Sequence, residues 1–152
     1  MREPTQQCSV RGVDVAYRFF DHTGDFGVEL EGADQAEVTR EALHAFTQLL
    51  TGDLSSVRPE AELEVELEGS DPAELLVALG NELIYCFEAE GFLAADLELE
   101  ELTSQWARGV LVGEDFDPQR HPIARPVKAV TYHQAACEPA ATGWRGRLIF
   151  DL

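Results

Sequence analysis

The chain has 152 residues, of which 45% are hydrophobic, and a formal net charge of −18. These values are typical of one globular domain, and no apolar run is long enough to cross a membrane. The negative charge argues against direct binding of RNA or DNA, because nucleic-acid affinity depends on many Lys and Arg contacts to phosphates. An acidic surface instead suits a cation site or a basic surface on a partner protein, and it equally suits solubility alone.

The compartment can be inferred from the N-terminal residues and the cysteines. A secretory signal consists of a basic start followed by an apolar segment. Residues 1–15 do not show this pattern. The three cysteines, Cys8, Cys86 and Cys137, are odd in number and widely spaced. This pattern favours a reducing compartment over a disulfide framework or a zinc site. We therefore expect a cytoplasmic protein, while its oligomeric state stays open.

The first predicted elements are two short strands. Residues 1–15 lack clear periodicity, so we expect a loosely ordered lead-in followed by one domain over residues 16–152. Residues 17–20 and 26–31 have the composition and alternation of strands. The run Asp21-His22-Thr23-Gly24-Asp25 joins them, and its glycine permits a tight turn.

Two helices follow from capping boxes. Asp34 begins the first helix and Gly52 closes it, and Asp71 and Gly91 bound the second in the same way. Between their caps, apolar residues recur at helical spacing.

The remaining elements are strands. Leu63, Val65 and Leu67 alternate with glutamates, which predicts a strand with one wet, acidic face. Four more strands are expected within residues 97–100, 106–112, 127–133 and 144–152. Helices flanked by runs of strands favour an α+β fold, a single domain with two helices packed on one side of mostly antiparallel strands.

The front turn and the end of the chain are the first candidates for chemistry. Asp21 and Asp25 flank His22, and Asp151 and Leu152 end a strand whose apolar alternation continues to the last residue. A strand held to its end would fix these groups in space, and carboxylate oxygens are the ligands that hard cations prefer. The commoner explanations are a turn whose aspartates bind local amides, a structural histidine and an ordinary edge strand.

Two further basic segments are candidates. Lys128 and His133 lie in the strand predicted over residues 127–133, and a lysine near clustered carboxylates would pair with them or with an anion on a partner. The polar loop upstream could present Arg120 and His121, or it could be a solvated connection. The chain has no P-loop, dinucleotide fingerprint, nucleophile elbow or HExxH motif, and no activated nucleophile stands out, so catalysis has little support.

Three separated segments together resemble the archease family. The run at residues 21–25, followed by Phe26-Gly27-Val28, resembles the family's DHTAD signature, with Gly24 in place of alanine. Residues 79–85 resemble its LNEL helix, and residues 113–133 resemble its GE…D…RH…KAhTYH block. The chain also ends in an aspartate and one aliphatic residue, as archeases do. The resemblance extends from about residue 17 to residue 152.

The resemblance implies a function and a set of site residues. Archeases are protein cofactors of the RtcB-type RNA ligase, which joins 3′-phosphate or 2′,3′-cyclic phosphate ends to 5′-hydroxyl ends in tRNA splicing and RNA repair. They promote guanylylation of the ligase and are not enzymes themselves. By position, Asp25, Asp151 and Leu152 would bind a divalent metal, with Ca²⁺ expected first and Mg²⁺ or Mn²⁺ as alternatives. Asp21, His22, Lys128 and His133 would support this site or contact the partner.

Other functions stay open on the residues alone. The chain could be a small metal-dependent hydrolase that uses Asp25, Asp151 and His22. It could also be a chaperone-like module that modulates RNA-modifying enzymes without chemistry, or an acidic structural domain. Whether the terminal carboxylate of Leu152 is itself a ligand is also open.

Overall fold

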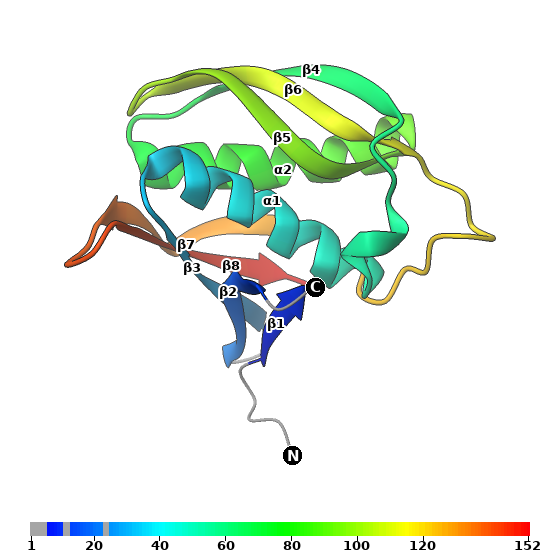
Figure 1. Cartoon of the computed structure of the whole chain (residues 1–152), viewed down its shortest axis with the longest axis horizontal. Helices are drawn as coiled ribbons and strands as arrows, with labels where there is room; N and C mark the ends of the chain where they lie inside the picture. The colour runs from blue at the N-terminus through cyan, green and yellow to red at the C-terminus, as the bar shows by residue number, and fades with distance from the viewer. Residues whose placement is uncertain (1–5, 11–12, 23–24) are drawn as a thin grey trace.

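The fold consists of two helices and two antiparallel sheets (Figure 1). A computed structural model describes residues 6–10, 13–22 and 25–152. The strands of the larger sheet are β1 (Gln6–Val10), β2 (Val13–His22), β3 (Asp25–Gly32), β7 (Ala129–Pro139) and β8 (Trp144–Asp151). Those of the smaller sheet are β4 (Ala61–Glu68), β5 (Phe92–Leu102) and β6 (Trp106–Asp115). The helices are α1 (Gln35–Thr51) and α2 (Pro72–Glu90), and a short 3-10 turn, η1 (Leu54–Ser56), follows α1.

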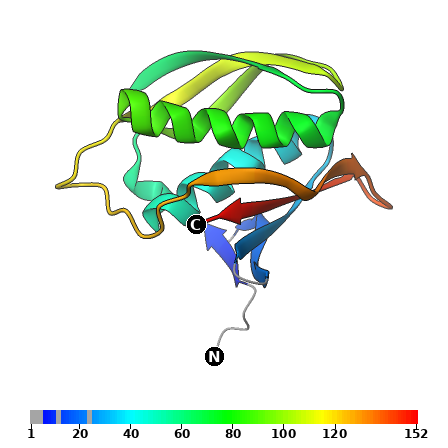
Figure 2. The ribbon, with the colours of Figure 1, turned by 180° about the vertical axis from the view of Figure 1, so that it is seen from behind.

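The two helices form a layer between the two sheets, as Figures 1 and 2 show from opposite sides. α1 contacts β5 above it and β3 below it, and α2 lies along β7 while also contacting β4 and β5. Each sheet therefore has helices on only one of its faces. The predicted α+β class with two helices packed on antiparallel strands is confirmed, and the strands form two sheets.

Both helices begin and end where the capping residues predict. The side chains of Asp34 and Asp71 accept hydrogen bonds from the amides of Glu37 and Glu74. Gly52 and Gly91 close the helices in the left-handed conformation that glycine adopts without strain. Because α2 packs between two sheets, its buried residues extend around more than one stripe. They are Leu75, Leu76, Val77, Leu79, Gly80, Leu83, Ile84 and Cys86. In the described ranges, no helix has the length and apolar character needed to span a membrane.

The smaller sheet has one buried and one acidic face. In β4, Val65 and Leu67 are buried against the helices, while the alternating glutamates of this strand are exposed. β6 lies between β4 and β5, so the glutamates of both outer strands flank the central strand. The strand with one wet, acidic face that the alternation predicts is confirmed.

The larger sheet has the strand order β1-β2-β3-β8-β7. The last strand, β8, therefore lies in the interior of the sheet, paired with β3 on one side and β7 on the other. This position excludes the ordinary edge strand that the sequence left open. Leu148 and Phe150 are buried in the core beneath the helices. Ile149 is also fully buried, although it points to the opposite face, where the ring of Phe20 covers Gly27 beside it.

The N-terminal segment differs from the predicted lead-in over residues 1–15. Residues 6–10 form β1, which pairs antiparallel with β2, and β2 already begins at Val13. Backbone hydrogen bonds to a neighbouring strand hold such a short segment without the apolar alternation on which the prediction depended. Residues 1–5 and 11–12 of the predicted lead-in lie outside the described residues.

Candidate functional site at the end of the larger sheet

The register of β3 and β8 brings two predicted ligands together. Phe26 lies opposite Phe150, and continuing this register by one residue sets Asp25 opposite Asp151. Directly opposite residues of an antiparallel pair point to the same face, with Cβ atoms about 5 Å apart. Asp25 is half-buried and Asp151 is exposed. The front turn and the last strand are therefore neighbours, as the sequence predicts.

The other residues of the front turn occupy different positions. Asp21 pairs with Phe26, so it belongs to the opposite face of the sheet from Asp25, and it is exposed. The backbone of His22 pairs with that of Asp25. Thr23 and Gly24, which complete the turn, lie outside the described residues. The alternation thus separates Asp21 from the Asp25 and Asp151 pair, which favours Asp25 as the ligand of this turn.

Lys128 joins this end of the sheet through its backbone. Its amide donates a 2.8 Å hydrogen bond to the carbonyl of Asp151, immediately before the register pair of Ala129 with Asp151. The side chain of Lys128 is exposed. Leu152 is half-buried, and its side chain packs against the core. Lys128, Asp151 and Leu152 therefore meet where β7 begins and β8 ends.

His133 lies farther along β7. The pairing of β7 with β8 shifts register between Thr131 and Ala136, and His133 lies within this irregular segment. At roughly 3.3 Å per residue, a strand places it up to about 13 Å from Ala129. Gln134 next to it has a φ of 58°, which is uncommon for a residue other than glycine. The register of β7 and β8 pairs His133 with neither Asp151 nor its neighbours, and its role in contacting a partner stays a prediction.

The residues at this end fit a cation that is shared with another molecule. Within the described part of the chain, no three His, Cys, Asp or Glu side chains form a group that could hold a metal ion. Asp25 and Asp151 carry hard oxygen donors and a main-chain oxygen of Leu152 could add another, fewer than the about six to eight that Ca²⁺ takes. Two opposed carboxylates repel each other, and a shared cation would remove that repulsion. Open coordination positions would then be left for water or a partner's ligands.

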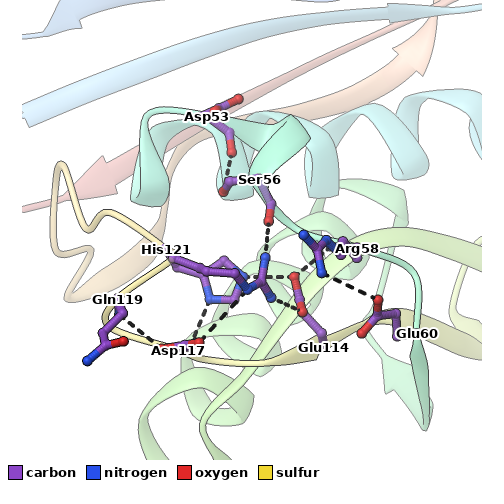
Figure 3. A network of polar contacts seen from close by, with 9 residues as sticks. Asp53, Ser56, Arg58, Glu60, Glu114, Asp117, Gln119 and His121 are labelled. Carbon is purple, nitrogen blue, oxygen red and sulfur yellow. Dashed lines mark hydrogen bonds and ion pairs between the residues drawn. The ribbon is translucent and has the colours of Figure 1, made fainter.

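In the predicted loop, Arg120 is partly exposed, whereas His121 is not presented to solvent. His121 is buried, and its Nε2 lies 2.8 Å from Oε2 of Glu114, which is also buried (Figure 3). Arg120 donates to the other oxygen of this carboxylate, and the amide of Arg58 donates to Oε2 at 2.8 Å. The prediction that the loop presents Arg120 and His121 is therefore wrong for His121. Buried polar groups are hydrogen-bonded, and both ring nitrogens of His121 have partners inside the protein.

The contacts of this network define its protonation. The Nδ1 atom of His121 accepts a 2.8 Å hydrogen bond from the amide of Asp117, so the proton of a neutral ring lies on Nε2, facing Glu114. Burial alone would raise the pKa of Glu114, but the donors of Arg58, His121 and Arg120 outweigh it and lower the pKa. The network is a satisfied structural unit.

The network and a second tether fix the segment that leads to Lys128. Beyond His121, the amides of Ala124 and Arg125 donate to the carbonyl of Leu50 at 2.8 and 3.2 Å, which ties the loop to the end of α1. The guanidinium of Arg125 then lies over the ring of Phe26, 4.6 Å from its centre. A positive charge is thereby held on the residue next to Asp25.

Sequence reasoning missed one residue at this site, Asn81. Its side-chain amide donates to the carbonyl of Val130 at 3.0 Å, and its Oδ1 accepts from the amide of Val130 at 3.0 Å. The signal was present, because Gly80 and Asn81 are two weak helix formers side by side in the middle of an apolar helix. Such a pair often marks a special packing contact.

Comparison with known proteins identifies the family of this chain. Residues 17–152 match the model of the Archease protein family. A protein archease of Methanopyrus kandleri is 38% identical over 135 residues, which cover 87% of this chain and 96% of that protein. A protein archease of Archaeoglobus fulgidus is 34% identical over 140 residues, covering 91% of this chain and 100% of that protein.

Two solved structures have the same fold. The solution structure of Methanobacterium thermoautotrophicum protein 1598 superposes with a TM-score of 0.73 at 27% identity and covers 90% of this chain and 99% of its own. The crystal structure of a Thermotoga maritima archease, described as a possible chaperone, has a TM-score of 0.60 at 16% identity and covers 88% and 94%. The second likeness shows the fold alone. The family match over nearly the whole chain, together with relatives above 30% identity, shows that this chain belongs to the archease family.

Proposed function

We propose that this protein activates an RtcB-type RNA ligase by promoting guanylylation of the ligase, and that it acts through the end of the larger sheet that carries Asp25 and Asp151. The observation that supports the proposal is the pairing of β3 with β8 up to Phe26 and Phe150, because extending this register by one residue would set Asp25 opposite Asp151, whose carbonyl accepts a hydrogen bond from the amide of Lys128. In this function the chain is a cofactor protein and not an enzyme.

The chemistry of this end suits a role beside a nucleotide. Asp25, Asp151 and Leu152 would hold a divalent cation, Ca²⁺ or alternatively Mg²⁺ or Mn²⁺, and the cation would supply positive charge that offsets the negative charge of nearby phosphates. Lys128 and Arg125 are cations at the same end, and either can hold a phosphate or a carboxylate of the ligase. Guanylylation is a nucleotidyl transfer, in which positioning and charge neutralisation supply most of the rate.

The charge of the whole chain supports a protein partner over direct RNA binding. With a net charge of −18, the chain repels phosphate backbones, whereas a basic enzyme that binds RNA attracts it. We propose that the acidic end enters the nucleotide-binding cleft of the ligase.

The test is a guanylylation assay with a purified RtcB-type ligase, with and without this protein. The wild-type chain should raise the rate, and Asp25→Asn and Asp151→Asn should each remove most of that increase. Glu64→Gln serves as the matched control, because Glu64 is an exposed carboxylate on the smaller sheet, and it should activate like the wild type. Full activation by Asp151→Asn would exclude the proposed role of this end.

A second arm tests the chain end. A tag fused after Leu152 should weaken Ca²⁺ binding and activation, since it converts the terminal carboxylate into a peptide bond. The chaperone-like alternative expects activation to survive the Asp25 variant, and the hydrolase alternative expects turnover by the purified protein alone that a chelator removes.

A further inference from the structure

The edge of the larger sheet is closed by a side chain of α2. β7 is the outermost strand beside β8, so its second edge has no partner among the strands that the structure describes. At this edge, Asn81 hydrogen-bonds both the amide and the carbonyl of Val130, each at 3.0 Å. The side-chain amide thus replaces the two backbone groups that a neighbouring strand would offer, and it occupies an edge otherwise open to pairing.

The helix approaches β7 closely at this point because the preceding residue is glycine. A methyl group on Gly80 would lie 2.5 Å from Cγ2 of Val130, which is itself buried. The missing side chain at Gly80 brings the backbone of α2 near enough for Asn81 to reach the strand. Figure 2 shows α2 running along β7.

The contact acts on the short part of β7 that adjoins the candidate site. Only Ala129, Val130 and Thr131 pair in regular register with β8 before the register shifts. Ala129 lies opposite Asp151, and the amide of Lys128 bonds to the carbonyl of Asp151. A strand segment of three pairs is weakly held by itself. Its middle residue, Val130, is the one that forms two hydrogen bonds with Asn81.

We infer that Asn81 is a positioning residue, which holds the start of β7 and thereby fixes Lys128 and Asp151 relative to each other. Asn81 acts through Val130 and does not itself touch the carboxylates. The consequence for metal binding and activation rests on the proposed function, while the consequence for the backbone does not.

The experiment compares Asn81→Ala with Thr47→Val. Thr47 is a matched control, since its buried hydroxyl donates a 2.7 Å hydrogen bond to the carbonyl of Ala94, on the side of the smaller sheet. In Asn81→Ala, the amides of Val130 and Lys128 should exchange with deuterium about 5- to 10-fold faster at matched global stability. The Kd for Ca²⁺, measured by calorimetry, should rise about 10-fold, as expected when a group that orients a ligand is lost. Asn81→Asp keeps the acceptor for the Val130 amide, so exchange at that amide should stay closer to the wild type.

Each outcome decides the inference. Unchanged exchange at Lys128 in Asn81→Ala would overturn it, and so would an equal loss of Ca²⁺ affinity in Thr47→Val. If the wild-type chain neither binds Ca²⁺ nor activates the ligase, the proposed function fails. The exchange rates of Val130 and Lys128 then decide the role of Asn81 alone.

Discussion

Two regions of this molecule use acidic residues in opposite ways. Around Glu114, one buried carboxylate receives donors from Arg58, Arg120 and His121. At the end of the larger sheet, the register of β3 and β8 extended by one residue sets Asp25 opposite Asp151, and within the described residues no hydrogen bond or ion pair engages their carboxylates. The first region has a donor for each carboxylate oxygen, whereas the second keeps its acceptors available.

The difference separates residues that build the fold from residues that are available to a ligand. Buried charges are stable only when paired and hydrogen-bonded, so the Glu114 network contributes structure and is not free to react. Carboxylates that water reaches, such as the half-buried Asp25 and the exposed Asp151, need no such partners, because water solvates them. Two of them directly opposite each other cost some stability, a cost that a function at this end would explain.

The largest expected effect comes from breaking the satisfied region. Glu114→Ala leaves the donors of Arg58, Arg120 and His121 without their acceptor in a buried site, so the free energy of unfolding should fall by about 3 kcal/mol. Urea unfolding measures this change. Glu60→Ala is the control, because its exposed carboxylate lies 3.9 Å from Arg58 and should contribute less than about 0.5 kcal/mol. Equal losses in the two variants would contradict the comparison.

The pH dependence of stability tests a second cluster of paired charges. His44 lies 3.3 Å from Glu41 and 3.0 Å from Asp96. Burial lowers the pKa of His44, but the hydrogen bonds and charges of the two carboxylates outweigh it and raise the pKa to about 9. The pKa of His44 in the folded protein therefore lies above its ordinary value of 6.5. The charged imidazole stabilises the fold fully below about pH 6.5, and this stabilisation is lost as the pH rises through about 9.

We expect this loss to reach about 2 kcal/mol, measured by urea unfolding between about pH 6 and pH 10. His44→Gln should flatten the profile over that range. An identical slope in the wild type and in His44→Gln would show that the imidazole carries no such coupling.

The contact between α2 and β7 predicts a smaller effect. Gly80→Ala gains helix propensity but places a methyl group 2.5 Å from Val130. Because the steric clash outweighs the gain in propensity, the unfolding free energy should fall by about 1 kcal/mol. Thermal unfolding measures the sign. Ala89→Gly, on the exposed part of the same helix, isolates the propensity term. A more stable Gly80→Ala protein would mean that the close approach is not required.

The smallest effect concerns the open region itself. Without metal, Asp151→Asn removes repulsion with Asp25 and should stabilise the chain by about 0.5 kcal/mol. In Ca²⁺ the order should reverse, because only the wild type gains stability from the bound ion. Melting temperatures with and without Ca²⁺ measure both. Glu64→Gln, on the other sheet, should respond to neither condition, and an unchanged order in Ca²⁺ would argue against a cation at this end.

Most of the fold could be predicted because local rules determine it. The caps at Asp34 and Asp71 and the glycines that close both helices depend only on neighbouring residues. The alternation in β8 predicted its two faces, but not its place between β3 and β7, which depends on residues more than a hundred positions away. The burial of Ile149 on the outer face is not indicated by any local pattern, because its neighbours there, Gly27 and the Phe20 ring that covers it, come from other strands.

The candidate site was predictable in part for the same reason. Asp25 and Asp151 follow from a turn and a strand end that sequence patterns locate, and the register then places them opposite each other. The position of His133 depends on a register shift, and the contact of Asn81 depends on which strand packs against α2. The sequence suggested that the loop presents Arg120 and His121 to solvent, because sequence alone does not show that Glu114 is buried beside them.

The interior position of β8 has a consequence for folding. It joins β3, near the front of the sequence, to β7, near its end, so pairing must close a loop of more than a hundred residues. Such non-local contacts form slowly and late. The opposed aspartates therefore exist only once the sheet is complete, and a partner that recognises this end would distinguish finished molecules from partly folded ones.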